Sequence, residues 1–180
     1  MILAAADDAP IALDLLPDWR VRFGAAAGSL ELEIGPGHGG FALAFARAHA
    51  GRALVAIEQR KKFAEIVAGK AERRGHRNLL VVQGDARLLA PRLFARGSLA
   101  AIHVHFPDPW WKRRHHGRRL VDDRMSLLLR RLLAPGGLLD FRTDVEEYAA
   151  GAAERLEAAG FRNEEGPGRR RSMHSFIGDS

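Results

Sequence analysis

Residues 30–58 read LELEIGPGHGGFALAFARAHAGRALVAIE, and this stretch decides the fold. It begins with the strand-length run Leu30–Ile34, turns through a glycine-rich loop and continues as a helical pattern over Gly39–Ala50. A second apolar run, Ala53–Glu58, follows. Two buried strands joined by a helix form a β-α-β unit, in which the strands are parallel and the helix covers one sheet face. The stretch therefore predicts an α/β protein.

The same alternation continues toward the C-terminus. Further strands and helices are expected at Lys61–Arg74, Leu79–Gln83, Leu99–Phe106, Asp122–Leu133, Leu138–Arg142 and Val145–Ala159. Pro135-Gly136-Gly137 is a helix-stop signal. This order predicts a Rossmann-like α/β fold with a mostly parallel central sheet and helices on both faces. Residues 1–28 show no clear period and are interpreted as a lead-in, followed by a single domain over residues 29–180.

Composition limits the class of protein. The 180 residues include no cysteine, which excludes a disulfide framework, a zinc finger and a thiol nucleophile. The apolar runs fall short of the roughly 18 residues of a membrane span. The acidic N-terminus is also atypical of a signal peptide, so we expect a cytoplasmic protein without a membrane partner.

The net charge of +6 favours a polyanionic partner, although the high arginine content is also what codon bias produces. The clustering of the basic residues favours a polyanionic partner over codon bias. Five formal positive charges fall within residues 112–119, KRRHHGRR, directly after two tryptophans. Such a basic run beside aromatic side chains is typical of nucleic-acid binding, because cations contact phosphates and flat rings stack on bases.

The glycine-rich loop predicts a nucleotide site. Gly35, Gly37 and Gly39 allow a sharp turn at the start of a helix, where free N–H groups and the helix dipole face a ligand. Glu58 stands 23 residues after Gly35, at the end of the next strand, where a carboxylate can accept both ribose hydroxyls of an adenosine. Asp85, just past the third strand, can reach an adenine amino group.

Local details distinguish between two cofactors that use this geometry. The dinucleotide pattern is G-x-G-x-x-G, whereas the spacing here is G-x-G-x-G. Glu33 precedes the first glycine by two positions and would repel a pyrophosphate, but it would attract the ammonium group of a methionine moiety. The pattern therefore favours S-adenosylmethionine (SAM) over NAD.

The strand that ends at Phe106 leads into Pro107-Asp108-Pro109-Trp110-Trp111. The two prolines fix the backbone around one carboxylate. Ligands of open α/β sheets bind at the carboxyl ends of the strands, so Asp108 is expected in the same crevice as Glu33 and Glu58. The tryptophans offer flat faces for base stacking, and capping of the sheet edge is their alternative role.

These segments together resemble one family. EIGPGHGG, IEQR, FPDPWWKRRHHGRRLV, LAPGGLLDFRTD and EEYA are similar to the bacterial tRNA (guanine-N7)-methyltransferases over residues 29–162. The resemblance implies a Rossmann-like SAM-dependent methyltransferase that acts on N7 of guanine 46 in the tRNA variable loop. It further implies tRNA as the partner, without an obligatory protein partner.

The resemblance also assigns roles to residues. Asp108 matches the catalytic aspartate, and the SAM-contacting acids match Glu33, Glu58, Asp85 and Asp108. The expected substrate-binding positions are Lys112, Arg114, His115, His116, Arg118, Arg119, Asp144 and Ser172.

The C-terminal tail departs from the family pattern, which is Thr-x-[Phe/Tyr]-Glu. Ser172 can replace the threonine, but His174 stands for the aromatic residue and Ser175 for the glutamate. The missing glutamate carboxylate affects the expected recognition of guanine, and the expected binding of SAM is unaffected. A catalytically altered SAM- or RNA-binding paralogue, or a methyltransferase with another acceptor, is therefore the alternative.

Two histidines invite a different interpretation. His103 and His105 lie on one face of the fourth predicted strand, as a pair of metal ligands does. No third ligand is evident from the sequence, so we expect no metal site.

Overall fold

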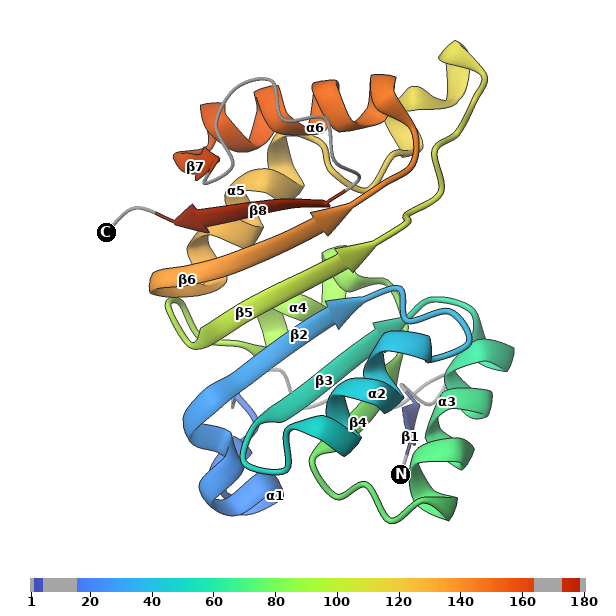
Figure 1. Cartoon of the computed structure of the whole chain (residues 1–180), viewed down its shortest axis with the longest axis vertical. Coiled ribbons are helices and arrows are strands. Elements are labelled where there is room, and N and C mark those ends of the chain that lie inside the picture. The colour runs from blue at the N-terminus through green and yellow to red at the C-terminus, as the bar shows by residue number, and fades with distance from the viewer. Residues whose placement is uncertain (1, 5–15, 164–172, 179–180) are drawn as a thin grey trace.

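The structure is a computed structural model that describes residues 2–4, 16–163 and 173–178 (Figure 1). Its sheet has the strand order β1-β4-β3-β2-β5-β6-β8-β7. Neighbours from β1 to β6 are parallel, whereas β8 runs antiparallel to both β6 and β7. The strands are β1 Ile2–Ala4, β2 Leu30–Ile34, β3 Ala53–Glu58, β4 Leu79–Gln83, β5 Leu99–His105, β6 Leu133–Arg142, β7 Phe161–Asn163 and β8 Met173–Gly178. The helices are α1 Trp19–Phe23, α2 Gly40–Ala48, α3 Lys61–Arg73, α4 Ala86–Leu93, α5 Asp123–Leu132 and α6 Glu146–Ala158, with 3-10 turns η1 Gly24–Ser29 and η2 Arg113–Arg118.

This is the expected Rossmann-like architecture. Strands β2, β3 and β4 have the predicted bounds, and the predicted helices differ from α2, α3, α5 and α6 by one or two residues at an end. One expectation is wrong: β6 begins at Leu133 and not at Leu138. The Pro135-Gly136-Gly137 turn signal lies inside this strand, where Gly136 has a φ of +72° and the β5–β6 register shifts. Part of the lead-in, Ile2–Ala4, also forms an edge strand beside β4.

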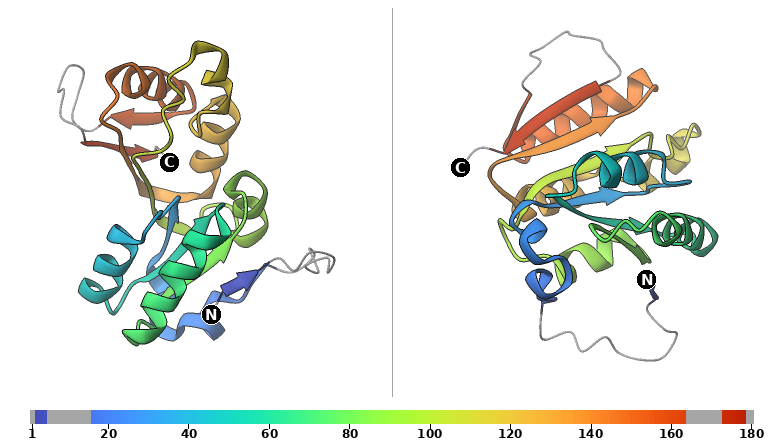
Figure 2. Two further views of the ribbon diagram at one scale, coloured as in Figure 1. Left: turned by 90° about the vertical axis from the view of Figure 1, so that its right-hand side faces the viewer. Right: turned by 60° about the horizontal axis from the view of Figure 1, so that its bottom comes forward.

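Helices cover both faces of the sheet (Figures 1 and 2), and an apolar layer lies between the helices and the sheet on each face. Helices α4, α5 and α6 pack on one face, with Leu32, Ile102 and Phe141 among the strand residues beneath them. Helices α2 and α3 pack on the other face, mainly over β3 and β4. Burial of apolar surface at about 25 cal/mol per Å² makes these two layers the main stabilising contribution. In the described part of the chain, no helix is long and apolar enough to cross a bilayer.

The α2 face of the sheet is polar at its centre. Alternation along the strands turns Glu31 and Glu33 of β2, His103 of β5 and Asp140 of β6 toward this face, and all four residues are buried. Glu33 pairs in register with His103, which in turn pairs with Asp140. A row of ionisable groups therefore crosses three strands close to their carboxyl ends.

Candidate functional site

A cavity of about 420 Å³ opens at the carboxyl ends of the central strands. Because parallel strands end at the same sheet edge, the loops after β2, β3, β4 and β5 all contribute to it. Five of the residues expected at the site line this cavity: Gly35, Glu58, Asp85, Asp108 and Arg118. The topology thus brings together residues that are more than 80 positions apart in the sequence.

The glycine-rich loop approaches the end of β3 closely. The Gly35 amide donates to the Ile57 carbonyl at 2.9 Å, and the Gly37 amide donates to Glu58 Oε2 at 3.0 Å. Gly39 precedes α2 with a φ of +83°, a conformation that favours glycine. A Cβ atom there would lie 2.9 Å from both methyl groups of Val67. Glycine at position 39 is therefore required by backbone conformation and by packing against α3.

Two carboxylates differ in how they are satisfied. Glu58 Oε2 accepts a hydrogen bond from the Gly37 amide, and Oε1 accepts one from the Arg60 amide at 2.8 Å. Both carboxylate oxygens are therefore hydrogen-bonded to backbone amides at the cavity wall. Glu33 is 2% exposed, and its Oε2 has no hydrogen-bond partner in the described part of the chain. Burial raises the pKa of Glu33 to about 8, with His103 lowering it and Glu58 raising it further. Glu33 is thus a buried acceptor suited to a cationic ligand.

Asp85 serves as the N-cap of α4, and its Oδ1 accepts from the Arg87 amide at 2.8 Å. Arg87 also lines the cavity and extends away from it, donating to Asp122 Oδ2 at 2.8 Å and to the Arg119 carbonyl at 2.8 Å. Helix α4 was not expected from the sequence, and Pro91 lies inside it. The capping geometry fixes the Asp85 carboxylate at the rim of the cavity.

The segment after β5 has an unusual backbone. Phe106 and Trp110 both have a φ of +49°, which is uncommon for bulky residues and clusters at functional sites. Pro107 and Pro109 lie between them and flank Asp108, which is exposed and lines the cavity. The Phe106 amide is tied to the Arg142 carbonyl at 2.7 Å. The local conformation therefore holds one carboxylate at the cavity mouth.

The basic segment forms the turn η2 next to this mouth. Arg118 lies over the Trp110 ring at 5.1 Å, and His115 meets the same ring edge-on with centroids 5.9 Å apart. Lys112 and Arg114 are exposed, as is Trp111 at 74%. Cations and aromatic faces thus adjoin the cavity, although only Trp110 and Arg118 of this group line it.

Arg119 makes contacts within the protein. Its Nε donates to the Pro109 carbonyl at 2.8 Å, its Nη2 lies 3.0 Å from His116 Nε2, and its guanidinium lies 5.0 Å from the Tyr148 ring. His116 Nδ1 is 3.6 Å from Glu147. These contacts join the basic turn to α6, so Arg119 braces the segment that carries Asp108.

The last two expected substrate positions are Asp144 and Ser172. Asp144 is exposed, two residues beyond the end of β6, and does not line the cavity. Ser172 lies outside the described residues. The antiparallel strand β8 begins at Met173 and pairs with Arg142 at the end of β6.

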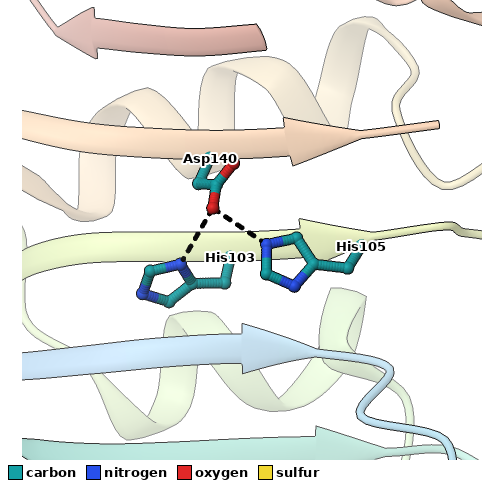
Figure 3. A group of neighbouring side chains, drawn as sticks. All are labelled: His103, His105 and Asp140. Atoms are coloured by element: carbon teal, nitrogen blue, oxygen red, sulfur yellow. Dashed lines mark hydrogen bonds and ion pairs between the residues drawn. The ribbon is translucent and has the colours of Figure 1, made fainter. Parts of the chain in front are cut away.

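The structure joins the two histidines singled out in the sequence to Asp140, and adds Glu31 and Arg142, none of which was expected at the site. His105 lines the cavity, and its Nε2 is 3.0 Å from Asp140 Oδ2 (Figure 3). His103 Nε2 lies 2.8 Å from Glu31 Oε2, while its Nδ1 is 3.7 Å from the same Asp140 oxygen. Arg142 donates to Asp140 at 2.7 and 2.9 Å, and these contacts hold the Asp140 pKa well below its usual range despite burial. The spacing of His103 and His105 in the sequence indicated that these two side chains lie on one face of the strand, but it did not indicate Asp140.

Comparisons with known proteins find methyltransferases over most of the chain. A family profile described as "Putative methyltransferase" matches residues 27–169. A tRNA (guanine-N(7)-)-methyltransferase of Anaeromyxobacter dehalogenans is 75% identical over 169 residues, covering 94% of this chain and 84% of the relative. One from Myxococcus xanthus is 49% identical and covers 84% and 73%.

Solved structures share the fold at low sequence identity. The aminoglycoside resistance methyltransferase NpmB1 superposes with a TM-score of 0.66 at 20% identity, covering 91% of this chain and 94% of that one. The antibiotic-resistance methyltransferase Kmr gives 0.63 at 20% identity, with 91% and 92% covered.

Proposed function

Because this chain belongs to the bacterial tRNA (guanine-N7)-methyltransferase family, we propose that it methylates N7 of a guanine in tRNA, with guanine 46 of the variable loop as the target. The observation that carries the proposal is the position of Asp108. Its carboxylate stands at the mouth of the cavity, between two residues of positive φ and beside the basic turn η2. This position serves both a bound methyl donor and an RNA base.

The residues at the cavity and behind its wall fit SAM: Gly35, Glu58 and Asp85 line the cavity, whereas Glu33, Gly37 and Gly39 are not among its lining residues. The unpartnered Oε2 of Glu33 is suited to the ammonium group of the methionine moiety, because a buried acceptor without a partner gains most from a cationic donor. Glu58 is placed for the ribose hydroxyls and Asp85 for the adenine amino group, with Gly35, Gly37 and Gly39 shaping the loop around the ligand. When bound, SAM supplies an electrophilic methyl group on a sulfonium.

The remaining chemistry is mainly positioning. Guanine N7 carries a lone pair and no proton, so its attack on the methyl group needs no strong general base. Asp108, together with Asp144, accepts hydrogen bonds from the N1–H and N2 amino edge of the guanine, which faces away from N7. Holding that edge directs N7 at the methyl group. Asp108 thus acts as the catalytic residue by orienting the base.

The basic turn binds the RNA backbone in this proposal. Lys112, Arg114 and Arg118 are exposed cations at the cavity mouth, and the imidazoles of His115 and His116 lie among them. Trp110 and Trp111 provide stacking faces, worth about 1–3 kcal/mol per base, for a guanine that leaves its stack at a cost of a few kcal/mol. Arg119 contributes through the brace to Pro109. Since tRNA is the substrate, the enzyme works in the cytoplasm.

The test is a methyl-transfer assay with nucleoside analysis. The protein is incubated with methyl-labelled SAM and tRNA transcripts that carry guanine or adenine at position 46, and the RNA is digested. We expect labelled 7-methylguanosine only from the guanine 46 transcript. Asp108→Asn should abolish the label while SAM binding persists. Asp123→Asn, an exposed aspartate on α5, is the matched control and should retain activity.

Two results would contradict the proposal. Label in a nucleoside other than 7-methylguanosine would change the acceptor and leave the methyltransferase assignment intact. SAM binding without any labelled nucleoside would favour the altered paralogue. The changed C-terminal signature makes both outcomes informative about guanine recognition.

A further inference from the structure

We propose that His103, His105 and Asp140 form a binding site for one divalent transition-metal ion, Zn²⁺ by preference, which joins β5 to β6 beneath the SAM cavity. The three residues offer one ligand atom each, and no two of these atoms are farther apart than 4.8 Å. They converge from two adjacent strands (Figure 3). The proposal concerns a structural ion and does not depend on the methyl-transfer assignment.

The separations fit a tetrahedral ion. Zinc lies about 2.0–2.2 Å from histidine nitrogen and carboxylate oxygen, so two tetrahedral ligands are about 3.4 Å apart. Asp140 Oδ2 is 3.0 Å from His105 Nε2 and 3.7 Å from His103 Nδ1, which brackets that value. The 3.7 Å separation is too long for a hydrogen bond. The third separation, between the two histidine nitrogens, is at most 4.8 Å.

His103 is already oriented as a ligand. Its Nε2 lies 2.8 Å from Glu31 Oε2, so in the neutral ring Nε2–H donates to this carboxylate and Nδ1 presents a lone pair toward Asp140. That Nδ1 is buried and has no hydrogen-bond partner in the described part of the chain. A carboxylate on the far nitrogen is the arrangement that metal-bound histidines have. Coordination would satisfy an atom that otherwise loses its hydration.

Asp140 is oriented in the same way by a second residue. Arg142 donates to Oδ1 through Nε at 2.9 Å and to Oδ2 through Nη2 at 2.7 Å, and both imidazoles approach the same Oδ2. For coordination, the proton of neutral His105 resides on Nδ1, which leaves Nε2 free to bind. Glu31 supplies negative charge beside the His103 ring and pairs with Arg52 on its other side, while Arg142 pairs with Asp140. The outer groups therefore hold each ligand in place.

The ligand set selects the class of metal. Two imidazole nitrogens and one carboxylate oxygen suit zinc and its neighbours in the transition series, whereas calcium and magnesium favour oxygen ligands. The ring of Phe41 lies 4.6 Å from the rings of both His103 and His105, between centroids, and shields the group from solvent. His105 is three residues before Asp108, so the ion would fix the strand end from which the strained segment departs.

The test uses the full chain and the metals themselves. Protein freed of metal with a chelator is given Co²⁺ or Zn²⁺, and bound metal is counted by mass spectrometry. We expect one ion per chain, visible d–d absorption of four-coordinate Co²⁺, and a higher melting temperature with Zn²⁺ that a chelator reverses. His105→Gln should weaken binding at least 100-fold. Glu31→Gln, which removes only the outer partner, should weaken it about 10–100-fold.

His76→Gln is the matched control, because His76 lies outside the cluster and should leave metal binding unchanged. The wild-type cobalt spectrum requires no substitution, so it decides the question even if a variant fails to fold. The proposal is overturned if the metal-free wild type takes up no stoichiometric Co²⁺ or Zn²⁺. It is equally overturned if folded His105→Gln binds the ion as tightly as the wild type does.

Discussion

Glu33 provides a quantitative test of the SAM site through proton release. Its pKa is raised to about 8 by burial, so at pH 7 roughly nine-tenths of the free protein carries it as the neutral acid. The ammonium group of SAM pairs with the ionised form. Binding at pH 7 should therefore release about 0.9 proton from Glu33, offset by about 0.1–0.2 proton taken up by the SAM amino group, and the apparent dissociation constant should be about tenfold higher than for fully ionised Glu33.

The affinity for SAM should follow a bell-shaped pH dependence. Between pH 6 and pH 8 the affinity rises as Glu33 ionises. Above pH 8 it falls again, because an α-amino group has an ordinary pKa of about 7.7–8.0 and the ligand loses its charge. Isothermal titration calorimetry in buffers with different ionisation enthalpies measures the released protons directly.

Substitution isolates the group responsible. Glu33→Gln should bind SAM more weakly, with proton release at pH 7 reduced to near zero. Glu65→Gln, an exposed change on α3 of the same chemistry, should behave as the wild type does. If Glu33→Gln binds SAM with the affinity and proton release of the wild type, the pairing of Glu33 with the ammonium group is refuted.

Four further outcomes are expected. The Glu33 pKa is about 8 in the folded protein and 4.5 as the ordinary value, so the contribution of Glu33 to stability is full below pH 4.5 and is lost as the pH rises to about 8. Glu33→Gln should therefore be more stable to urea than the wild type across that pH window. The gain in the free energy of unfolding is a few kcal/mol at most, at about 1.36 kcal/mol per pKa unit. Glu58→Ala should raise the SAM requirement about 10–100-fold in steady-state kinetics, because it removes an acceptor and frees the loop amides. Arg118→Ala should weaken tRNA binding and reduce the salt slope by about 1 in filter-binding assays. Gly39→Ala should destabilise the protein by about 1–3 kcal/mol in chemical denaturation, and Val67→Ala should recover the packing part of that loss in the double variant.

Strands β2 to β6 could be predicted from the sequence because they are short apolar runs between turns, whereas β1, β7 and β8 were not expected. Helix α4 could not, since Pro91 interrupts its helical pattern and only the Asp85 cap marks its start. The extension of β6 back to Leu133 was also hidden, because Pro135-Gly136-Gly137 indicates a turn and only the neighbouring β5 allows the strand to continue through it.

The site shows the same division between local and long-range information. Glu58, Asp85 and Asp108 follow strand ends, so topology alone places them at one edge of the sheet. Asp140 could not be connected with His103 from the sequence. Their contact requires the β5–β6 register, which pairs these residues 37 positions apart, and no local pattern specifies a register between strands separated by a helix.

The polar row across β2, β5 and β6 also bears on how the chain reaches its native sheet. Sliding one strand by a single residue would turn Glu31, His103 or Asp140 into the apolar layer beneath α4, α5 and α6. An unpaired buried charge or polar group costs several kcal/mol, and a misaligned intermediate would expose its counterpart as well. Parallel sheets assemble slowly from distant segments and pass through partly paired states. The ionisable row therefore helps to specify the register of the central strands, since a one-residue slip would bury these groups among apolar side chains.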